Sequence, residues 1–200
     1  IHYSTDYVFD GAKDAPYTED DEPRPINAYG RSKLAGERAI QAVGVPHLIL
    51  RASWIYGARG KNFLLTILRL ARERDELSIV DDQVGAPTWS RALAAATGDI
   101  LRRLGFGRPG FGDACAKQGG IYNLSATGQT SWHGFAVAIL AHAASAPPGQ
   151  SDFALARMPV LKPIRTEHYP LPARRPRYSV LANAKLQRAF GLAMPDWKTS

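Results

Sequence analysis

Two strand-like segments separated by one amphipathic helix constrain this fold more than any other feature of the sequence. Residues 1–4 form a β-prone run that stops at polar residues, and residues 47–52 form an apolar run typical of a buried strand. Between them, residues 31–43 carry apolar side chains at helical spacing, with Asn27 as a candidate N-cap and Gly44 as a stop signal. This order predicts a βαβ unit with parallel strands.

The remaining sequence continues the alternation and predicts an α/β fold. Further helices are expected over residues 62–74, 91–104, 131–144 and 183–190, and further strands over residues 77–80, 121–124 and 160–164. Residues 11–27 and the glycine-rich residues 105–119 are expected to be loops, the second of them unusually long. Residues 145–152 are the best linker candidate.

Charge and composition exclude several classes of protein. The chain has 200 residues and a formal net charge of +7, but its arginines are scattered, so we expect no nucleic-acid partner. A basic surface also suits a substrate that carries a diphosphate. No apolar run reaches the roughly 18 residues that a membrane span needs. The one cysteine, Cys115, excludes an internal disulfide framework and fits the cytoplasm.

Tyr29 and Lys33 stand four residues apart near the start of the first predicted helix, so their side chains share one face. In open parallel sheets, ligands bind at the carboxyl ends of the strands, where this helix begins. A ketone that receives a hydride needs a proton, and an isolated phenol, with a pKa of about 10, is a weak acid. A neighbouring ammonium lowers the pKa of a phenol and makes it a better general acid. The pair indicates a reductase-type site, although both residue types are also common on solvated helix faces.

Two segments that follow predicted strands strengthen this interpretation. Residues 4–11 place the Thr5 hydroxyl at the end of a strand, where it can hydrogen-bond a substrate carbonyl. Residues 53–57 place Trp54 directly after the second strand, where an indole ring can pack on a sugar face. Together these segments favour a carbohydrate substrate.

Four sequence blocks resemble the dTDP-4-dehydrorhamnose reductases, a group of extended short-chain dehydrogenases/reductases. They are residues 4–11 (STDYVFDG), 29–37 (YGRSKLAGE), 51–57 (RASWIYG) and 82–88 (DQVGAPT). The blocks occur in the order and at the spacing of that family, and the similarity runs from residue 1 to about residue 190. Residues 105–119 match less well and look like an insertion.

The resemblance implies a role for each residue of the candidate site. Tyr29 would donate a proton to the C4 oxygen of a 4-keto sugar, Lys33 would tune Tyr29, and Thr5 would hydrogen-bond the reacting oxygen. The implied substrate contacts are Thr5, Asp6, Tyr7 and Trp54. The implied contacts to NADPH or NADH are Tyr3, Tyr29 and Lys33, and no metal site is implied. The implied reaction is reduction of dTDP-4-dehydro-β-L-rhamnose to dTDP-β-L-rhamnose, a step that supplies lipopolysaccharide O-antigen biosynthesis.

The resemblance also implies the domain organisation. Residues 1–57 and 88–126 would form the carboxy-terminal part of a Rossmann-like nucleotide-binding domain, and residues 58–87 and 127–200 a smaller α/β substrate-binding domain. The glycine-rich phosphate-binding turn of this fold is absent. We therefore expect about one hundred residues to precede Ile1, and we expect this fragment to be inactive alone. Without those strands, one sheet edge would be bare. A homodimer, the choice between NADPH and NADH, and a magnesium requirement are left open.

Two other functions compete with the reductase. Nucleotide-sugar epimerases and dehydratases share the Tyr-x-x-x-Lys pattern, but dehydratases carry an acidic pair beside the catalytic Thr, where this chain has only Asp6. A regulatory subunit of methionine adenosyltransferase resembles the same family and acts through protein contact. That subunit lacks the tryptophan block, so Thr5, Tyr29, Lys33 and Trp54 together favour catalysis.

Several other residues receive simpler interpretations. The acidic run over residues 19–22 is expected to be a solvated loop, and the histidines show no metal-ligand spacing. Arg51 is expected to pair with a carboxylate inside the fold. Three tryptophans are expected to be packing residues: Trp89, Trp132 and Trp197. Three arginines could equally reach a diphosphate or face water: Arg174, Arg175 and Arg177.

Overall fold

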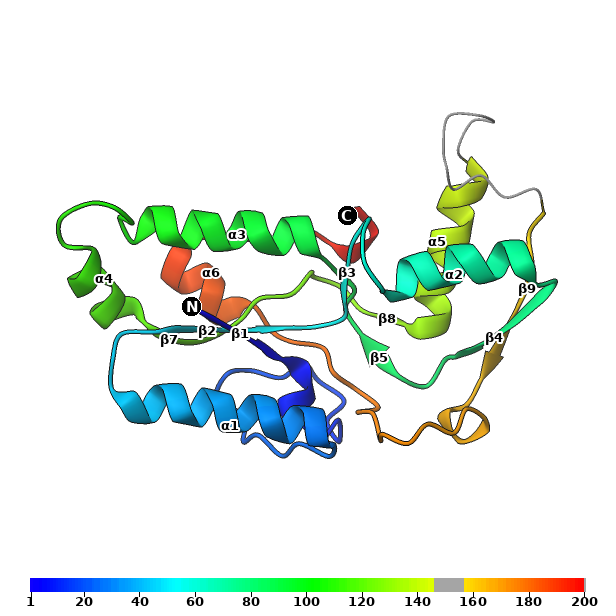
Figure 1. Cartoon of the computed structure of the whole chain (residues 1–200), viewed down its shortest axis with the longest axis horizontal. Coiled ribbons are helices and arrows are strands. Elements are labelled where there is room, and N and C mark those ends of the chain that lie inside the picture. The colour runs from blue at the N-terminus through cyan, green and yellow to red at the C-terminus, as the bar shows by residue number, and fades with distance from the viewer. Residues whose placement is uncertain (146–156, 200) are drawn as a thin grey trace.

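A three-stranded parallel sheet forms the centre of the computed structural model, which describes residues 1–145 and 157–199 (Figure 1). Its strands are β1 (His2–Thr5), β2 (Leu48–Ala52) and β7 (Gly120–Asn123), in the order β1-β2-β7. Both β1 and β7 pair with β2 in parallel. The parallel βαβ unit expected from the sequence is therefore confirmed.

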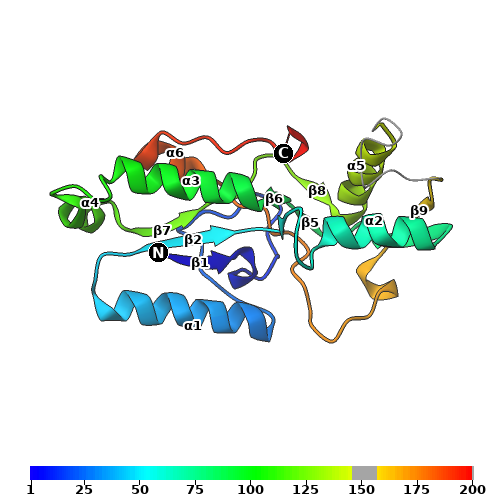
Figure 2. The same ribbon diagram turned by 45° about the horizontal axis from the view of Figure 1, so that its top comes forward.

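Helices cover both faces of this sheet (Figure 2). Helix α1 (Ala28–Val43) lies on one face, and α3 (Ser90–Arg103) and α6 (Ala184–Phe190) lie on the other. The Asn27 side chain caps α1 by accepting a hydrogen bond from the Gly30 amide at 2.8 Å, and Gly44 ends the helix in the left-handed conformation. These caps fix where α1 begins and therefore where Tyr29 stands.

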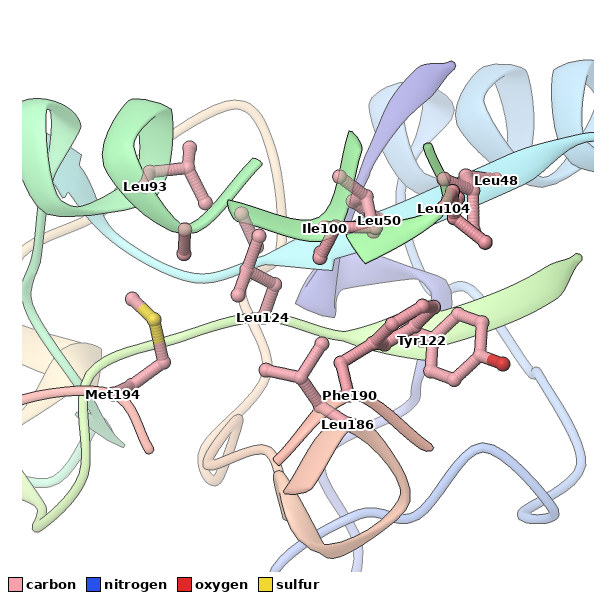
Figure 3. Close-up of a cluster of buried hydrophobic side chains, with 12 residues drawn as sticks. Leu48, Leu50, Leu93, Ile100, Leu104, Tyr122, Leu124, Leu186, Phe190 and Met194 are labelled. Atoms are coloured by element: carbon pink, nitrogen blue, oxygen red, sulfur yellow. The ribbon is translucent and has the colours of Figure 1, made fainter. Parts of the chain in front are cut away.

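A compact apolar cluster fills the space between the sheet and helices α3 and α6 (Figure 3). Because alternate residues of a strand point to the same face, β2 sends Leu48, Leu50 and Ala52 into this cluster. The opposite face of β2 carries Ile49 and Arg51 toward α1. The other members of the cluster are Leu93, Ala96, Ile100, Leu104, Tyr122, Leu124, Leu186, Phe190 and Met194.

A second group of elements lies beyond the carboxyl ends of β1 and β2 (Figure 1). Helices α2 (Phe63–Glu73) and α5 (Trp132–Ser145) pack against the parallel pair β4 (Glu76–Val80) and β9 (Val160–Ile164). Two short pairs connect the two groups: β3 (Ile55–Tyr56) with β6 (Thr88–Trp89), and β5 (Val84–Gly85) with β8 (Thr130–Ser131). Short 3-10 helices span Asp6–Val8 (η1), Thr166–His168 (η2) and Trp197–Thr199 (η3).

The expected loop over residues 105–119 is wrong, because helix α4 spans Phe111–Gln118. Phe111, Ala114 and Cys115 pack against the apolar cluster of the sheet. This tertiary packing outweighs the low helix propensity of a glycine-rich segment. The other predicted helices and strands are confirmed to within three residues at each end.

The proposed division into two domains stays a prediction, but α6 departs from it. Leu186 and Phe190 belong to the apolar cluster of the sheet, although residues 127–200 were assigned to the smaller domain. The expected linker over residues 145–152 lies almost entirely outside the described residues.

Candidate active site

The carboxyl ends of β1 and β2 meet at a buried network of hydroxyls around Asp6. Thr5 Oγ1 donates to Asp6 Oδ1 at 2.9 Å, and Ser53 Oγ, just after β2, donates to Asp6 Oδ2 at 3.1 Å. Ser179 adds a third side-chain hydrogen bond from the carboxy-terminal part of the chain. Burial raises the pKa of Asp6 to about 6, although these hydrogen bonds oppose the rise.

Asp6 is only 2% exposed, and both of its carboxylate oxygens are hydrogen-bonded within the protein. This burial argues against the expected contact between Asp6 and a sugar. The carboxylate instead holds the Thr5 hydroxyl, whose oxygen also accepts a hydrogen bond from the Tyr7 amide at 3.2 Å. Asp6 therefore fixes the orientation of the Thr5 hydroxyl.

Tyr29 stands in the first turn of α1 with 56% of its surface exposed. Its ring meets the ring of Tyr7 edge-on, with centroids 6.0 Å apart and planes at 79°. Gly30 lets the helix approach this closely, because a side chain there would overlap the Tyr7 carbonyl oxygen. The exposed phenol lies at the carboxyl edge of the sheet, where ligands of such folds bind.

Lys33 follows Tyr29 by one helical turn, and its ammonium donates a hydrogen bond to the Tyr3 carbonyl on β1. The Tyr3 hydroxyl in turn bonds Thr97 Oγ1 of α3 at 2.7 Å. Tyr3 is 39% exposed, which leaves part of its ring available to a ligand. The ammonium is thus placed at β1, and its expected pairing with the Tyr29 phenol stays a prediction.

Tyr7 lies between Asp6 and Tyr29. Burial raises the pKa of Tyr7 to about 12, the Asp6 carboxylate adds to the rise, and the Arg175 guanidinium opposes it. The Tyr7 phenol therefore stays protonated at neutral pH and can donate a hydrogen bond to a ligand, but it is a weaker acid than an ordinary tyrosine.

Trp54 lies at the border of the two groups of elements, directly after β2 and Ser53. Its indole ring stacks on that of Trp132, with centroids 3.5 Å apart and planes at 4°. Trp132 also donates from Nε1 to Gln83 Oε1 at 3.2 Å. The sequence interpretation of Trp132 as a plain packing residue missed this contact with a candidate site residue.

A pocket of about 670 Å³ opens between α2, β4 and residues 166–175. Its walls are mainly apolar, and the polar or aromatic lining residues include Trp132, Gln83, Thr166, Arg174 and Arg175. The volume lies in the range of small-molecule sites. Because the Arg175 guanidinium is near enough to Tyr7 for its charge to oppose the rise in the pKa of that phenol, the pocket extends toward the edge of the sheet where Thr5 and Tyr29 lie.

The whole chain, residues 1–200, matches the family model described as the RmlD substrate binding domain. The chain belongs to this family. Its sequence is 50% identical over 198 residues to a dTDP-4-dehydrorhamnose reductase of Burkholderia thailandensis, covering 99% of this chain and 64% of that protein. It is 43% identical over 198 residues to the dTDP-4-dehydrorhamnose reductase of Escherichia coli K12, covering 99% of this chain and 62% of that protein.

Solved structures agree with this RmlD assignment. A dTDP-4-dehydrorhamnose reductase from Bacillus anthracis, in complex with NADP, superposes with a TM-score of 0.82 at 35% identity, covering 99% of this chain and 62% of that one. A UDP-glucuronic acid 4-epimerase from Bacillus cereus, at 18% identity and a TM-score of 0.69, shares the fold alone. The family resemblance and the α/β fold predicted from the sequence are confirmed. The chain spans less than two thirds of the length of the curated relatives it matches.

Several residues of the RmlD-type site were not identified from the sequence. Ser53 and Ser179 reach Asp6 from positions 47 and 173 residues away in the chain, which no local pattern reveals. Within residues 1–145 and 157–199, no group of three or more His, Cys, Asp or Glu side chains could hold a metal ion. No helix among these residues is long and apolar enough to cross a membrane.

Proposed function

We propose that the protein containing this chain reduces a 4-keto nucleotide sugar, dTDP-4-dehydro-β-L-rhamnose, to dTDP-β-L-rhamnose with NADPH or NADH. The observation that carries the proposal is the exposed Tyr29 phenol at the carboxyl edge of the parallel sheet. Tyr29 stands one helical turn from Lys33 and close to Tyr7, which directly follows Thr5 and Asp6 in the chain. The identity with reductases over nearly the whole chain supports it. The similarity to a reductase solved in complex with NADP supports a nicotinamide dinucleotide as the cofactor.

The residues at the sheet edge fit a nicotinamide nucleotide. The Lys33 ammonium and the exposed part of the Tyr3 ring lie beside β1, where they can meet ribose hydroxyls and a nicotinamide ring. When bound, the reduced nicotinamide supplies a hydride to the ketone carbon. The Tyr29 phenol donates a proton to the ketone oxygen, so that the carbonyl becomes a secondary alcohol.

The pocket beside Trp132 offers room for the nucleotide part of the substrate. Arg174 and Arg175 give it positive charge that can meet a diphosphate, and its apolar walls can pack against a base. Trp54, at the border between this pocket and the Thr5 edge, would pack on the sugar. We also propose that the protein acts in the cytoplasm, because its single cysteine fits a reducing compartment.

A direct assay tests the proposal with the protein expressed from its complete gene. Oxidation of NADPH or NADH is followed with dTDP-4-dehydro-β-L-rhamnose, and in parallel UDP-hexoses are tested for epimerisation. We expect reductase activity, and we expect Tyr29→Phe to lower kcat by at least about 100-fold with little change in the Kd of dTDP-β-L-rhamnose.

Tyr122→Phe is the matched control, because the Tyr122 hydroxyl bonds the Gln118 carbonyl at 2.8 Å within the core. This variant should keep the wild-type kcat. A wild-type rate in Tyr29→Phe would show that the assigned acid is wrong. A wild-type protein that epimerises UDP-hexoses but reduces no dTDP-4-keto sugar would overturn the proposed function.

A further inference from the structure

Trp54 has an unusual backbone conformation. Its φ of 47° lies in the left-handed region, and no other residue except glycine has a positive φ within residues 1–145 and 157–199. A bulky side chain in this region is disfavoured and persists only when its surroundings hold it. The contacts of the indole ring must therefore hold the backbone of Trp54 in this conformation.

Trp132 provides the first of these contacts. The near-parallel planes, at 4°, and the centroid separation of 3.5 Å place the two indoles face to face with little offset. Trp132 is itself held in place, because its Nε1 donates to Gln83 Oε1 at 3.2 Å and its ring meets that of Phe63 at 4.6 Å. A fixed ring thus covers one face of Trp54.

Gly85 provides the second contact. A Cβ atom at this position would overlap the Cε2, Nε1 and Cζ2 atoms of the Trp54 indole. Gly85 pairs with Thr130 across the β5–β8 ladder, two residues before Trp132. Trp132 directly follows β8, so the β5–β8 ladder brings both contacts to the Trp54 ring. The Trp54 carbonyl is also fixed, since it accepts a hydrogen bond from the Thr88 amide at 3.1 Å.

The stacked pair is connected to the pocket. Gln83, which holds Trp132, donates from Nε2 to Thr166 Oγ1 at 3.0 Å, and Thr166 Oγ1 donates to Asp82 Oδ1 at 2.6 Å. Gln83, Trp132 and Thr166 all line the 670 Å³ pocket. Trp132 thus contacts Trp54 and also forms part of the pocket wall.

We propose that Trp132 is a positioning residue that, together with Gly85, clamps the Trp54 indole as a fixed wall for the sugar of the bound nucleotide sugar. This inference rests on the proposed function. The clamp fixes the position of the surface that the sugar ring contacts, while the pocket that Trp132 also lines receives the nucleotide. Trp132 therefore acts on sugar recognition through Trp54 and also forms part of the nucleotide pocket, whereas Gly85 contacts Trp54 without lining that pocket.

Circular dichroism tests the clamp without any turnover. Two stacked indoles couple their electronic transitions and give a paired positive and negative band, which single tryptophans do not give. We expect this paired band in the wild-type protein and its loss in Trp132→Ala and in Trp54→Ala. Trp89→Phe is the control, because Trp89 lies outside the stack, next to Arg91. A paired band that persists in Trp132→Ala would overturn the clamp.

Binding measurements with the protein from the complete gene test the positioning role. The Kd values of dTDP-β-L-rhamnose and of dTDP are measured by calorimetry for each variant. We expect Gly85→Ala, which lies outside the pocket lining, to raise the Kd of the sugar nucleotide by up to about tenfold and to leave the Kd of dTDP within about twofold. Trp132→Ala should raise the Kd of the sugar nucleotide by a larger factor than the Kd of dTDP. Trp132→Phe, which keeps a flat ring, should restore most of the affinity, and Trp89→Phe should bind both ligands like the wild type.

The outcomes separate this inference from the proposed function. If Trp132→Ala loses the paired band but keeps the wild-type ratio of the two Kd values, the positioning role is wrong. If the wild-type protein binds dTDP-β-L-rhamnose with the expected dependence on Trp132 but reduces no ketone, the proposed function fails and the clamp stands. A wild-type protein that binds neither nucleotide overturns both.

Discussion

The Arg51 guanidinium on β2 donates two hydrogen bonds to the Glu37 carboxylate on α1, in the buried layer between the sheet and the helix. Arg51 Nε donates to Glu37 Oε1 at 3.0 Å, and Arg51 Nη2 donates to Glu37 Oε2 at 2.7 Å. Glu37 follows Lys33 by one helical turn and Tyr29 by two, so all three side chains share one face of α1. The ion pair therefore fixes the face of the helix that carries the candidate catalytic residues.

Glu37→Gln is expected to destabilise the fold strongly. The two side chains are only 2% and 1% exposed, so the variant leaves a buried guanidinium without its countercharge. Loss of one partner from a buried ion pair costs about 3–5 kcal/mol in the free energy of unfolding. Urea unfolding of this chain measures the effect.

Glu73→Gln is the matched control for this prediction. Glu73 pairs with Arg69 at 2.8 Å on the surface of α2, with the two side chains 50% and 61% exposed. Exposed pairs contribute about 1 kcal/mol or less. Equal unfolding midpoints for the two variants would show that the buried pair is not essential to the fold.

Gly30→Ala is expected to push α1 away from η1. The new methyl group would overlap the Tyr7 carbonyl oxygen and lie 2.9 Å from Pro25 Cβ. Overpacking of this kind costs about 1–3 kcal/mol, which outweighs the gain of about 1 kcal/mol from the higher helix propensity of alanine. The urea unfolding midpoint should fall.

Gly98→Ala in α3 makes the same substitution where nothing lies within 4 Å of the new Cβ. This variant should gain about 1 kcal/mol in the free energy of unfolding, because alanine favours the helix. Gly30→Ala and Gly98→Ala are therefore expected to change the free energy of unfolding in opposite directions. A stabilised Gly30→Ala variant would mean that α1 does not lie tightly on η1.

The sequence predicted those helices and strands whose apolar spacing, capping residues and stop residues all lie within one short segment. Helix α1 was expected over residues 31–43 and begins three residues earlier, because the Asn27 cap admits one more turn. The pairing of Arg51 with a carboxylate is confirmed, but no local pattern could name Glu37 as the partner. Helix α4 was missed because its stability comes from the packing of Phe111, Ala114 and Cys115 on distant residues.

The same distinction applies to the candidate site. Thr5, Tyr29 and Trp54 were found because each belongs to a short motif next to a strand or helix end. Trp132 meets Trp54 only through the tertiary fold. The acidic run was expected to be solvated, but Glu19 Oε1 accepts a hydrogen bond from the Asn123 amide on β7 at 2.8 Å. This hydrogen bond satisfies the backbone N–H of Asn123, and nothing in the sequence indicates that this N–H needs a side-chain partner.

Asp6→Asn is expected to change how the stability of the chain depends on pH. Burial raises the pKa of Asp6 to about 6, whereas an unfolded aspartate has a pKa of about 3.9. Between these values the folded state binds more protons than the unfolded state, so stability falls as pH rises. The contribution is fully present below about pH 4 and is lost as pH rises through about 6, which amounts to about 3 kcal/mol.

The asparagine side chain cannot titrate, so the variant should lack this loss of stability between pH 4 and 8. With the hydrogen bonds to Thr5 and Ser53 kept, the variant should be more stable than the wild type at pH 8. Urea unfolding at several pH values gives the difference between the two proteins. Asp10→Asn should show the opposite sign, because the Ala12 amide and the Tyr17 hydroxyl lower the pKa of Asp10 and stabilise its ionised form. Parallel curves for the wild type and Asp6→Asn would mean that the Asp6 carboxylate is not desolvated beneath Thr5, and its role in holding that hydroxyl would have to be abandoned.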